Sequence, residues 1–228
     1  MGIANQKLAR LAGGVYLITV LTGIFSLAYV PSKIFIWDDF KKTIQLFDNF
    51  ELLFRLSIVS EMLCYLAFLI LPIILYFIFE KINKQVSFTM ILFVLVAVPI
   101  SLMAISHKLD ILDILSDQSL DRIGVEQLQK QVGHYYNKIK IAQIFWGLWL
   151  LPFGYLIFTS GMVPKLLGVL LMLGGMGYMV NFIGPVLSVN YSQSILPIIA
   201  KVPSSIGEIG TCLWLFIIGL KKEFRYEN

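Results

Sequence analysis

Six apolar segments, each long enough to cross a bilayer as a helix, are the feature that most restricts how this chain can fold. They run over about 11–30, 52–79, 86–106, 139–159, 164–187 and 196–220. A helix needs about 20 such residues to cross the hydrocarbon core. Of the 228 residues, 58% are hydrophobic and 14% are charged, against about 45–50% and about 25% in a soluble domain. We predict an all-α integral membrane bundle of six transmembrane helices, in one transmembrane domain covering residues 1–228.

Two polar segments between these spans carry amphipathic patterns. In the segment 31–50, apolar residues recur at helical spacing: Ile36, Trp37, Phe40, Ile44 and Phe47. In the segment 107–138, apolar residues alternate with charged ones, the apolar set being Leu109, Ile111, Leu112 and Leu115. Amphipathic helices with aromatic anchors lie at membrane interfaces. We therefore expect one or two interfacial helices in the outer loops.

Glycines recur every seven residues through the fourth and fifth spans, at positions 147, 154, 161, 168 and 175. A seven-residue step keeps small residues on nearly one face of a helix. Two glycine strips result, Gly147/Gly154 and Gly168/Gly175, where a neighbouring backbone can come close. The link around Gly161 is short, so the two spans are expected to be antiparallel neighbours. The same faces could also support a homo-oligomer.

Basic residues near the span ends give an orientation. With the N-terminus inside, the cytoplasmic segments hold Lys7, Arg10, Lys81, Lys84, Lys165, Lys221, Lys222 and Arg225. By the positive-inside rule, we expect a plasma-membrane protein with both termini in the cytoplasm. The net charge of +4 is spread over loops and tail, so we expect the lipid bilayer as partner and no nucleic acid.

The informative residues are the ionisable ones in or near the spans: Arg55 and Glu61 in the second, and Glu208 in the sixth. A charge at a helix centre is disfavoured by roughly 2.5–3.5 kcal/mol, so these groups must face protein or water. Tyr178 and Asn181 add a polar pair in the fifth span. We hypothesise an outward-open polar cavity between the second, fifth and sixth spans. Its expected ligand-binding residues are Arg55, Glu61, Asn181 and Glu208.

A structural interpretation of the same residues stays open. Arg55 follows Glu51 by four positions, the spacing of an ordinary helical ion pair at the water interface. Glu61 and Glu208 could be protonated and hydrogen-bonded between helices, holding them together.

The histidines and cysteines give no metal or cofactor pattern. His107 ends the third span and His134 lies in the next polar segment, away from the mid-membrane position of haem ligands. Cys64 and Cys212 lie in apolar runs without a C-x-x-C partner. The sequence contains no G-x-S-x-G, H-E-x-x-H or P-loop motif. We therefore expect no cofactor and no metal, and the motif pattern disfavours an enzyme.

Several motifs together resemble a known family. They are ARLAG at 9–13, LFRLSIVSE at 53–61, FWGL at 145–148, GYL at 154–156, the run 160–171 with Pro164 and Gly168, GE at 207–208 and LWL at 213–215. These are similar to the bacterial multi-pass membrane family called domain of unknown function 4386. The family often has Asp at the position of Glu61 and His at the position of Trp149. The resemblance implies a six-helix membrane protein and singles out Arg55, Glu61 and Glu208 as matched polar positions.

Three functional interpretations follow from the sequence. The first is a protein that binds or transports a small polar solute or lipid headgroup in the outer cavity. The second is a structural or accessory membrane protein without a ligand. The third is a membrane-embedded enzyme acting on lipid, with a carboxylate as acid or base. A water-lined opening reaching Glu61 would favour the first or third, and a dry bundle with paired carboxylates the second.

Overall fold

The computed structural model describes residues 3–116 and 122–221, and all regular structure among them is helical. Six helical spans are long and apolar enough to cross a membrane. They are Asn5–Ile34, Asn49–Phe79, Lys84–Leu115, Ile123–Ser160, Lys165–Leu187 and Leu196–Ile218. The predicted all-α bundle of six transmembrane helices is confirmed, and the chain is a multi-pass membrane protein. Lys222 and Arg225, used above for the orientation, lie outside the described residues.

The described residues form seven α-helices and three short helices of other types. The first span joins α1 (Ile3–Gly23), the π-helix η1 (Ile24–Tyr29) and α2 (Val30–Ile34). The next four are α3 (Phe40–Phe79), α4 (Lys84–Leu115), α5 (Arg122–Ser160) and α6 (Lys165–Leu187). The 3₁₀ turn η2 (Tyr191–Gln193) leads to α7 (Leu196–Leu213), which continues as the π-helix η3 (Trp214–Ile218).

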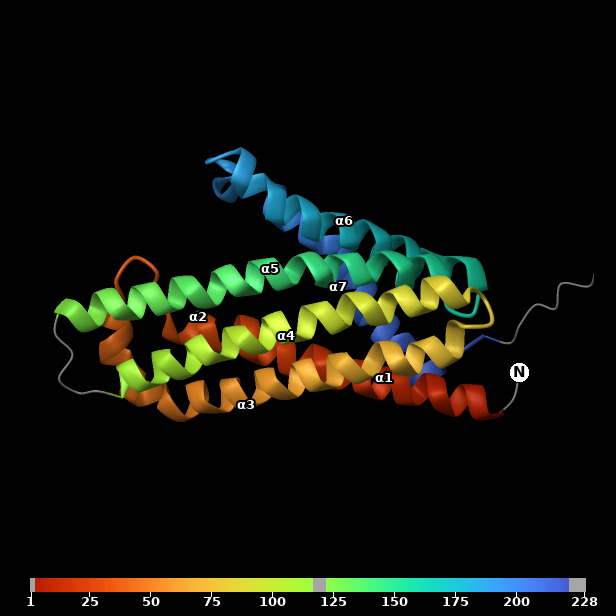
Figure 1. Cartoon of the computed structure of the whole chain (residues 1–228), viewed down its shortest axis with the longest axis horizontal. Helices are drawn as coiled ribbons and strands as arrows, with labels where there is room; N and C mark the ends of the chain where they lie inside the picture. The colour runs from red at the N-terminus through yellow and green to blue at the C-terminus, as the bar shows by residue number, and fades with distance from the viewer. Residues whose placement is uncertain (1–2, 117–121, 222–228) are drawn as a thin grey trace, which may run out of the picture.

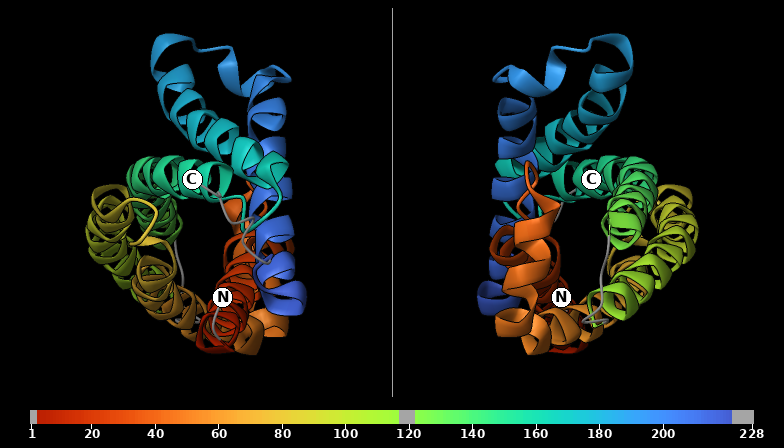
Figure 2. Two further views of the ribbon diagram at one scale, coloured as in Figure 1. Left: turned by 90° about the vertical axis from the view of Figure 1, so that its right-hand side faces the viewer. Right: turned by 90° about the vertical axis from the view of Figure 1, so that its left-hand side faces the viewer.

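The helices pack in a ring, each on its neighbours, in the order α1, α3, α4, α5, α6, α7 (Figure 2). The ring closes where α1 meets α7 and η3. There the backbone N–H of Leu220 donates to Oε1 of Gln6 at 3.0 Å. We call this the terminal end of the bundle and the opposite one the far end. Toward its tip the α6–α7 hairpin leans away from the other helices (Figure 1).

Helix α3 has 40 residues and α5 has 39, or about 60 Å each at 1.5 Å per residue. The hydrocarbon core is about 30 Å thick, so these helices extend beyond it. Residues 40–50 of the first amphipathic segment and 107–115 of the second are helical, and both parts continue spanning helices instead of standing alone. The first opens α3 and the second ends α4. Their apolar residues Phe47 and Ile111, each 1% exposed, pack into the bundle. Ile36 and Trp37 lie in the non-helical link between α2 and α3.

The glycine strips of α5 and α6 face each other. A Cβ built on Gly154 would lie 2.5 Å from the carbonyl oxygen of Gly168, and one on Gly175 would lie 2.7 Å from that of Gly147. The predicted close approach is therefore present, and it is used within the chain. Gly161, in the turn between the helices, has φ +63°, a left-handed conformation that glycine adopts without strain. The two helices therefore form a tight antiparallel pair.

Candidate functional site

A buried ion pair joins α3 to α4. The Lys108 Nζ lies 2.6 Å from Oε2 of Glu61, and the side chains are 1% and 0% exposed. Lys108 lies on α4 because this helix continues to Leu115, past the end of the apolar run. The continuation brings the lysine to Glu61. The cation also lies 5.3 Å from the ring centre of Tyr135 and 5.8 Å from that of Phe54. Aromatic faces at this distance stabilise an ammonium group.

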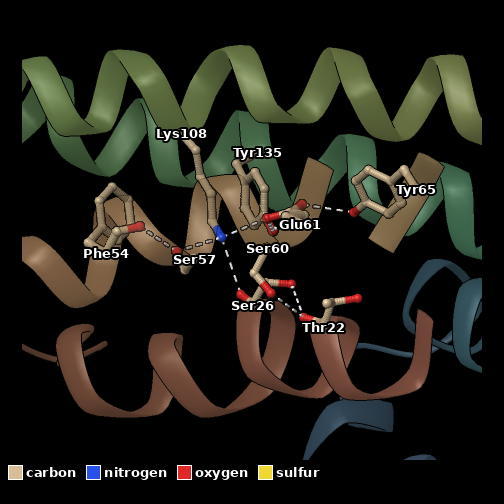
Figure 3. A network of polar contacts seen from close by, with 9 residues as sticks. All are labelled: Thr22, Ser26, Phe54, Ser57, Ser60, Glu61, Tyr65, Lys108 and Tyr135. Carbon is tan, nitrogen blue, oxygen red and sulfur yellow. Dashed lines mark hydrogen bonds and ion pairs between the residues drawn. The ribbon is translucent and has the colours of Figure 1, made fainter. Parts of the chain in front are cut away.

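Both charged groups are fully surrounded by hydrogen-bond partners (Figure 3). Glu61 accepts from the hydroxyl of Tyr65 at 2.8 Å and from that of Tyr135 at 2.9 and 3.0 Å. Lys108 donates to the carbonyl oxygen of Ser26 at 3.2 Å and to Oγ of Ser57 at 3.3 Å. Because a buried charge is tolerated only when its remaining sites are satisfied, this network is a stable arrangement. The network joins four helices: η1, which continues α1, and α3, α4 and α5.

The Ser26 carbonyl is free for Lys108 because of the local backbone. In η1 the N–H of Val30 bonds to the carbonyl of Phe25, five residues back. By the same spacing, Ser26 would need the N–H of residue 31, and Pro31 has none. An unpaired carbonyl in a membrane helix is costly unless another group satisfies it. The π-helix and the proline thus create an acceptor that the lysine fills.

A second carboxyl, that of Glu208 on α7, lies in different surroundings. The hydroxyl of Tyr16 donates to its Oε2 at 3.4 Å, and Tyr178 lies beside the same carboxyl. No cationic side chain among the described residues forms an ion pair with it. A charge at the centre of a membrane helix is disfavoured by about 2.5–3.5 kcal/mol on insertion scales. Glu208 is therefore held by tyrosine hydroxyls, without a cationic partner among the described residues.

Glu208 faces a cavity of about 280 Å³ between α1, η1, α3, α5, α6 and α7, which we call the Glu208 cavity. Six aromatic residues line it: Tyr16, Tyr65, Phe68, Trp146, Trp149 and Tyr178. Of the described lining residues, Glu208 is the only Asp, Glu, Lys, Arg or His. Trp146 also lines the cavity, and its Nε1 is buried without a hydrogen-bond partner.

Tyr65 connects the two carboxyl groups. Its ring lines the Glu208 cavity, while its hydroxyl donates to Glu61. Glu61 itself does not line the cavity. The Glu61–Lys108 network therefore supports one wall of the cavity from behind and is not open to a ligand.

Two of the predicted ligand-binding residues lie elsewhere. The exposed side chain of Arg55 pairs with Glu51, with Nη2 2.6 Å from Oε1, which is the alternative raised from the sequence. Asn181 accepts from the hydroxyl of Tyr191 at 2.9 Å and donates to the carbonyl of Pro197 at 3.4 Å. It therefore joins the tip of the α6–α7 hairpin. The structure does not bring Arg55, Glu61, Asn181 and Glu208 into one cavity.

Sequence reasoning missed Lys108 and Tyr135, which it placed in a polar surface segment. A signal was present for Lys108. The buried residues of α4 include Ser87, Val94, Ser101, Lys108 and Leu115, at steps of seven. Residues at this spacing share one helix face, so Lys108 continues the inward face of the third span.

The two histidines are also brought together by the longer helices. The rings of His107 on α4 and His134 on α5 stack with centroids 5.4 Å apart, and Nδ1 of His107 lies 2.8 Å from Oε1 of Gln131. In the described part of the chain no group of three or more His, Cys, Asp or Glu side chains is arranged to hold a metal ion.

Comparisons with known proteins agree with the motifs. An uncharacterized protein of Archaeoglobus fulgidus is 26% identical over 166 residues, which cover 72% of this chain and 85% of that protein. No solved structure matches. The model of the family "Domain of unknown function (DUF4386)" matches residues 11–219. The chain therefore belongs to the DUF4386 family.

Proposed function

We propose that the protein binds a hydrophobic or amphipathic small molecule in the Glu208 cavity, and that this molecule enters from the bilayer. The observation that carries the proposal is a cavity within the spanning helices that holds a carboxyl without a cationic partner. Its volume of about 280 Å³ is near the lower end of ligand sites, about 300–1,000 Å³. An apolar lining with few polar groups is typical of such sites.

The depth of the carboxyl favours a ligand that is soluble in lipid. Glu208 lies 12 residues after Leu196 and 10 before Ile218, the ends of its span. At 1.5 Å per residue it is about 18 Å from one end and about 15 Å from the other. A strongly hydrated solute would lose its water shell at this depth, whereas an apolar or amphipathic molecule would lose little.

An entry route lies between η1 and α7. The cavity is lined by Ile24 of η1 and by Ser205 and Ile209 of α7. Ile24 is 50% exposed and Ile209 41%, so both residues also face the outside of the protein. Helix α7 packs on α1 and α6 but not on η1. These residues therefore form the rim of a sideways opening toward lipid.

Native mass spectrometry of the gently purified protein tests the proposal. The blocking variant is Ser205→Phe, which puts a ring into the opening, and the matched control is Ile206→Phe. Ile206 is the next residue of α7, 52% exposed and outside the lining. We expect a discrete small-molecule adduct on the wild type and on Ile206→Phe, and its loss from Ser205→Phe. The same adducts on all three proteins, or none on any, would contradict the proposal.

A further inference from the structure

We infer that the ligand of the Glu208 cavity is a hydrophobic organic cation, such as an alkyl or aryl ammonium ion. The inference rests on the proposed function and names its substrate class. It follows from the acidic side chain of Glu208, the aromatic residues that line the same cavity and the lack of a basic side chain among the described lining residues.

The charge of the lining has one sign. Glu208 is acidic, and no Lys, Arg or His is among the described residues that line the cavity. The nearby cation Lys108 is engaged by Glu61 behind the Tyr65 wall. A ligand that brings a positive charge supplies what Glu208 lacks, whereas an anionic ligand would be repelled by it.

Aromatic residues make up much of the wall around Glu208. Tyr16 and Phe68 both meet Trp149 edge to face, with centroids 6.1 and 5.2 Å apart. Tyr65 lies 6.1 Å from Trp146. Aromatic faces attract ammonium groups through the ring quadrupole, and cages of this composition recognise quaternary ammonium ligands. A carboxyl and several aromatic rings around one cavity favour a bulky cation over a small inorganic one.

A zwitterionic lipid headgroup fits less well than a simple cation. Its phosphate would lie in the same apolar cavity, without a basic partner among the described lining residues. Burying an unpaired anion is unfavourable. We therefore place the ligand's positive charge at Glu208, among the aromatic rings that line the cavity.

Isothermal titration calorimetry in a neutral maltoside detergent tests this with four probes that share a ten-carbon chain. They are decyltrimethylammonium, 1-decanol, decyl sulfate and decylphosphocholine. The proteins are the wild type, Glu208→Gln and the control Glu51→Gln, which removes one exposed carboxylate that does not line the cavity. Ser205→Phe serves as the blocked reference.

We expect the wild type and Glu51→Gln to bind decyltrimethylammonium at least tenfold more tightly than any other probe. Glu208→Gln should lose at least tenfold in ammonium affinity and keep its affinity for decanol. The probe series on the wild type is informative even if Glu208→Gln fails to fold.

Three outcomes would count against the inference, and only the last also counts against the proposed function. If decanol or decyl sulfate binds as tightly as the ammonium, the inference is wrong while a ligand-binding cavity remains. If decylphosphocholine does so, the exclusion of phospholipid headgroups is wrong. If no probe binds the wild type more tightly than Ser205→Phe, both the inference and the proposed function fail.

Discussion

Lys108 of α4 and Glu61 of α3 form an ion pair of 2.6 Å that is almost completely buried. Removing one partner leaves an uncompensated buried charge, which costs about 3–5 kcal/mol. We predict that Lys108→Met lowers the free energy of unfolding by about that amount. The double variant Glu61→Gln/Lys108→Met should recover part of the loss, because it leaves no unpaired charge. Thermal melts in detergent measure both effects.

The control for this prediction is Lys84→Met. Lys84 is on the same helix but exposed, and surface substitutions usually change stability by less than about 0.5 kcal/mol. Equal melting temperatures for Lys108→Met and Lys84→Met would show that the buried pair contributes nothing to stability.

A second prediction concerns the origin of the Ser26 acceptor. Pro31→Ala restores a backbone N–H that can reach the Ser26 carbonyl, so Lys108 has a competitor there. Lys108→Met should lower the free energy of unfolding by about 1 kcal/mol less in the Pro31→Ala background than in the wild type. This is the usual contribution of one hydrogen bond. A double-mutant cycle measures this coupling directly. A coupling energy of zero would mean that the proline does not prepare the lysine's site.

The glycine strips give a third prediction with a built-in contrast. A Cβ at Gly154 would lie 2.5 Å from a carbonyl oxygen of α6, whereas one at Gly133, also on α5, meets nothing within 4 Å. Gly154→Ala should lower stability by about 1–3 kcal/mol through overpacking. Gly133→Ala should raise it by up to about 1 kcal/mol, because alanine is the better helix former. Similar melting temperatures for both variants would contradict the close packing.

Local patterns were sufficient for the spans and for the α5–α6 pair. The number of spans depends on the length of apolar runs, and the glycine contact depends on a seven-residue step; both are properties of neighbouring residues. The helical parts of the two amphipathic segments, 40–50 and 107–115, were recognised for the same reason. What the pattern did not show is that these segments continue the spanning helices, which depends on their packing against distant parts of the chain.

The candidate site was predicted only in part for that reason. Glu61 and Glu208 were singled out because a charge within an apolar run needs a partner. Glu61 is completely buried, and the ligand-binding role of both carboxyls stays a prediction. Arg55 was assigned to them, yet it precedes Glu61 by six residues, about 240° around the helix. That rotation directs it to another face. The true partner, Lys108, is 47 positions away, and only the continuation of α4 brings it to Glu61.

The orientation in the membrane is a fourth prediction. The terminal end of the bundle carries Lys7, Arg10, Lys81, Lys84 and Lys165. We therefore propose that the protein lies in the plasma membrane with this end on the cytoplasmic side. The hydrogen bond between Gln6 and Leu220 places the first and last described helices together at this end. Fusions of a fluorescent protein, which matures in the cytoplasm, should therefore be bright at either terminus. A dark, translocated fusion at the C-terminus would reverse the orientation and place the far end inside.

The last prediction concerns acid sensitivity at the start of α3. Asp39 is the N-cap of this helix, and its Oδ1 accepts from the backbone N–H of Lys42 at 3.2 Å. This hydrogen bond lowers the pKa of the Asp39 carboxyl below its usual value of 3.8. Because the pKa is lower in the folded state, the carboxylate stabilises the fold above pH 3.8, and this contribution is lost as the pH falls through the folded pKa.

The matched variant is Asp39→Asn, which keeps a capping oxygen but cannot ionise. We expect the wild type to be the more stable protein at pH 6, and the difference in melting temperature to shrink as the pH is lowered from 5 to 3. The Asp39 side chain is 37% exposed, so added salt should reduce the difference at pH 6 as well. A difference that stays constant across this pH range would mean that the carboxylate charge plays no part in the cap, and that its hydrogen-bonding oxygen alone begins the helix.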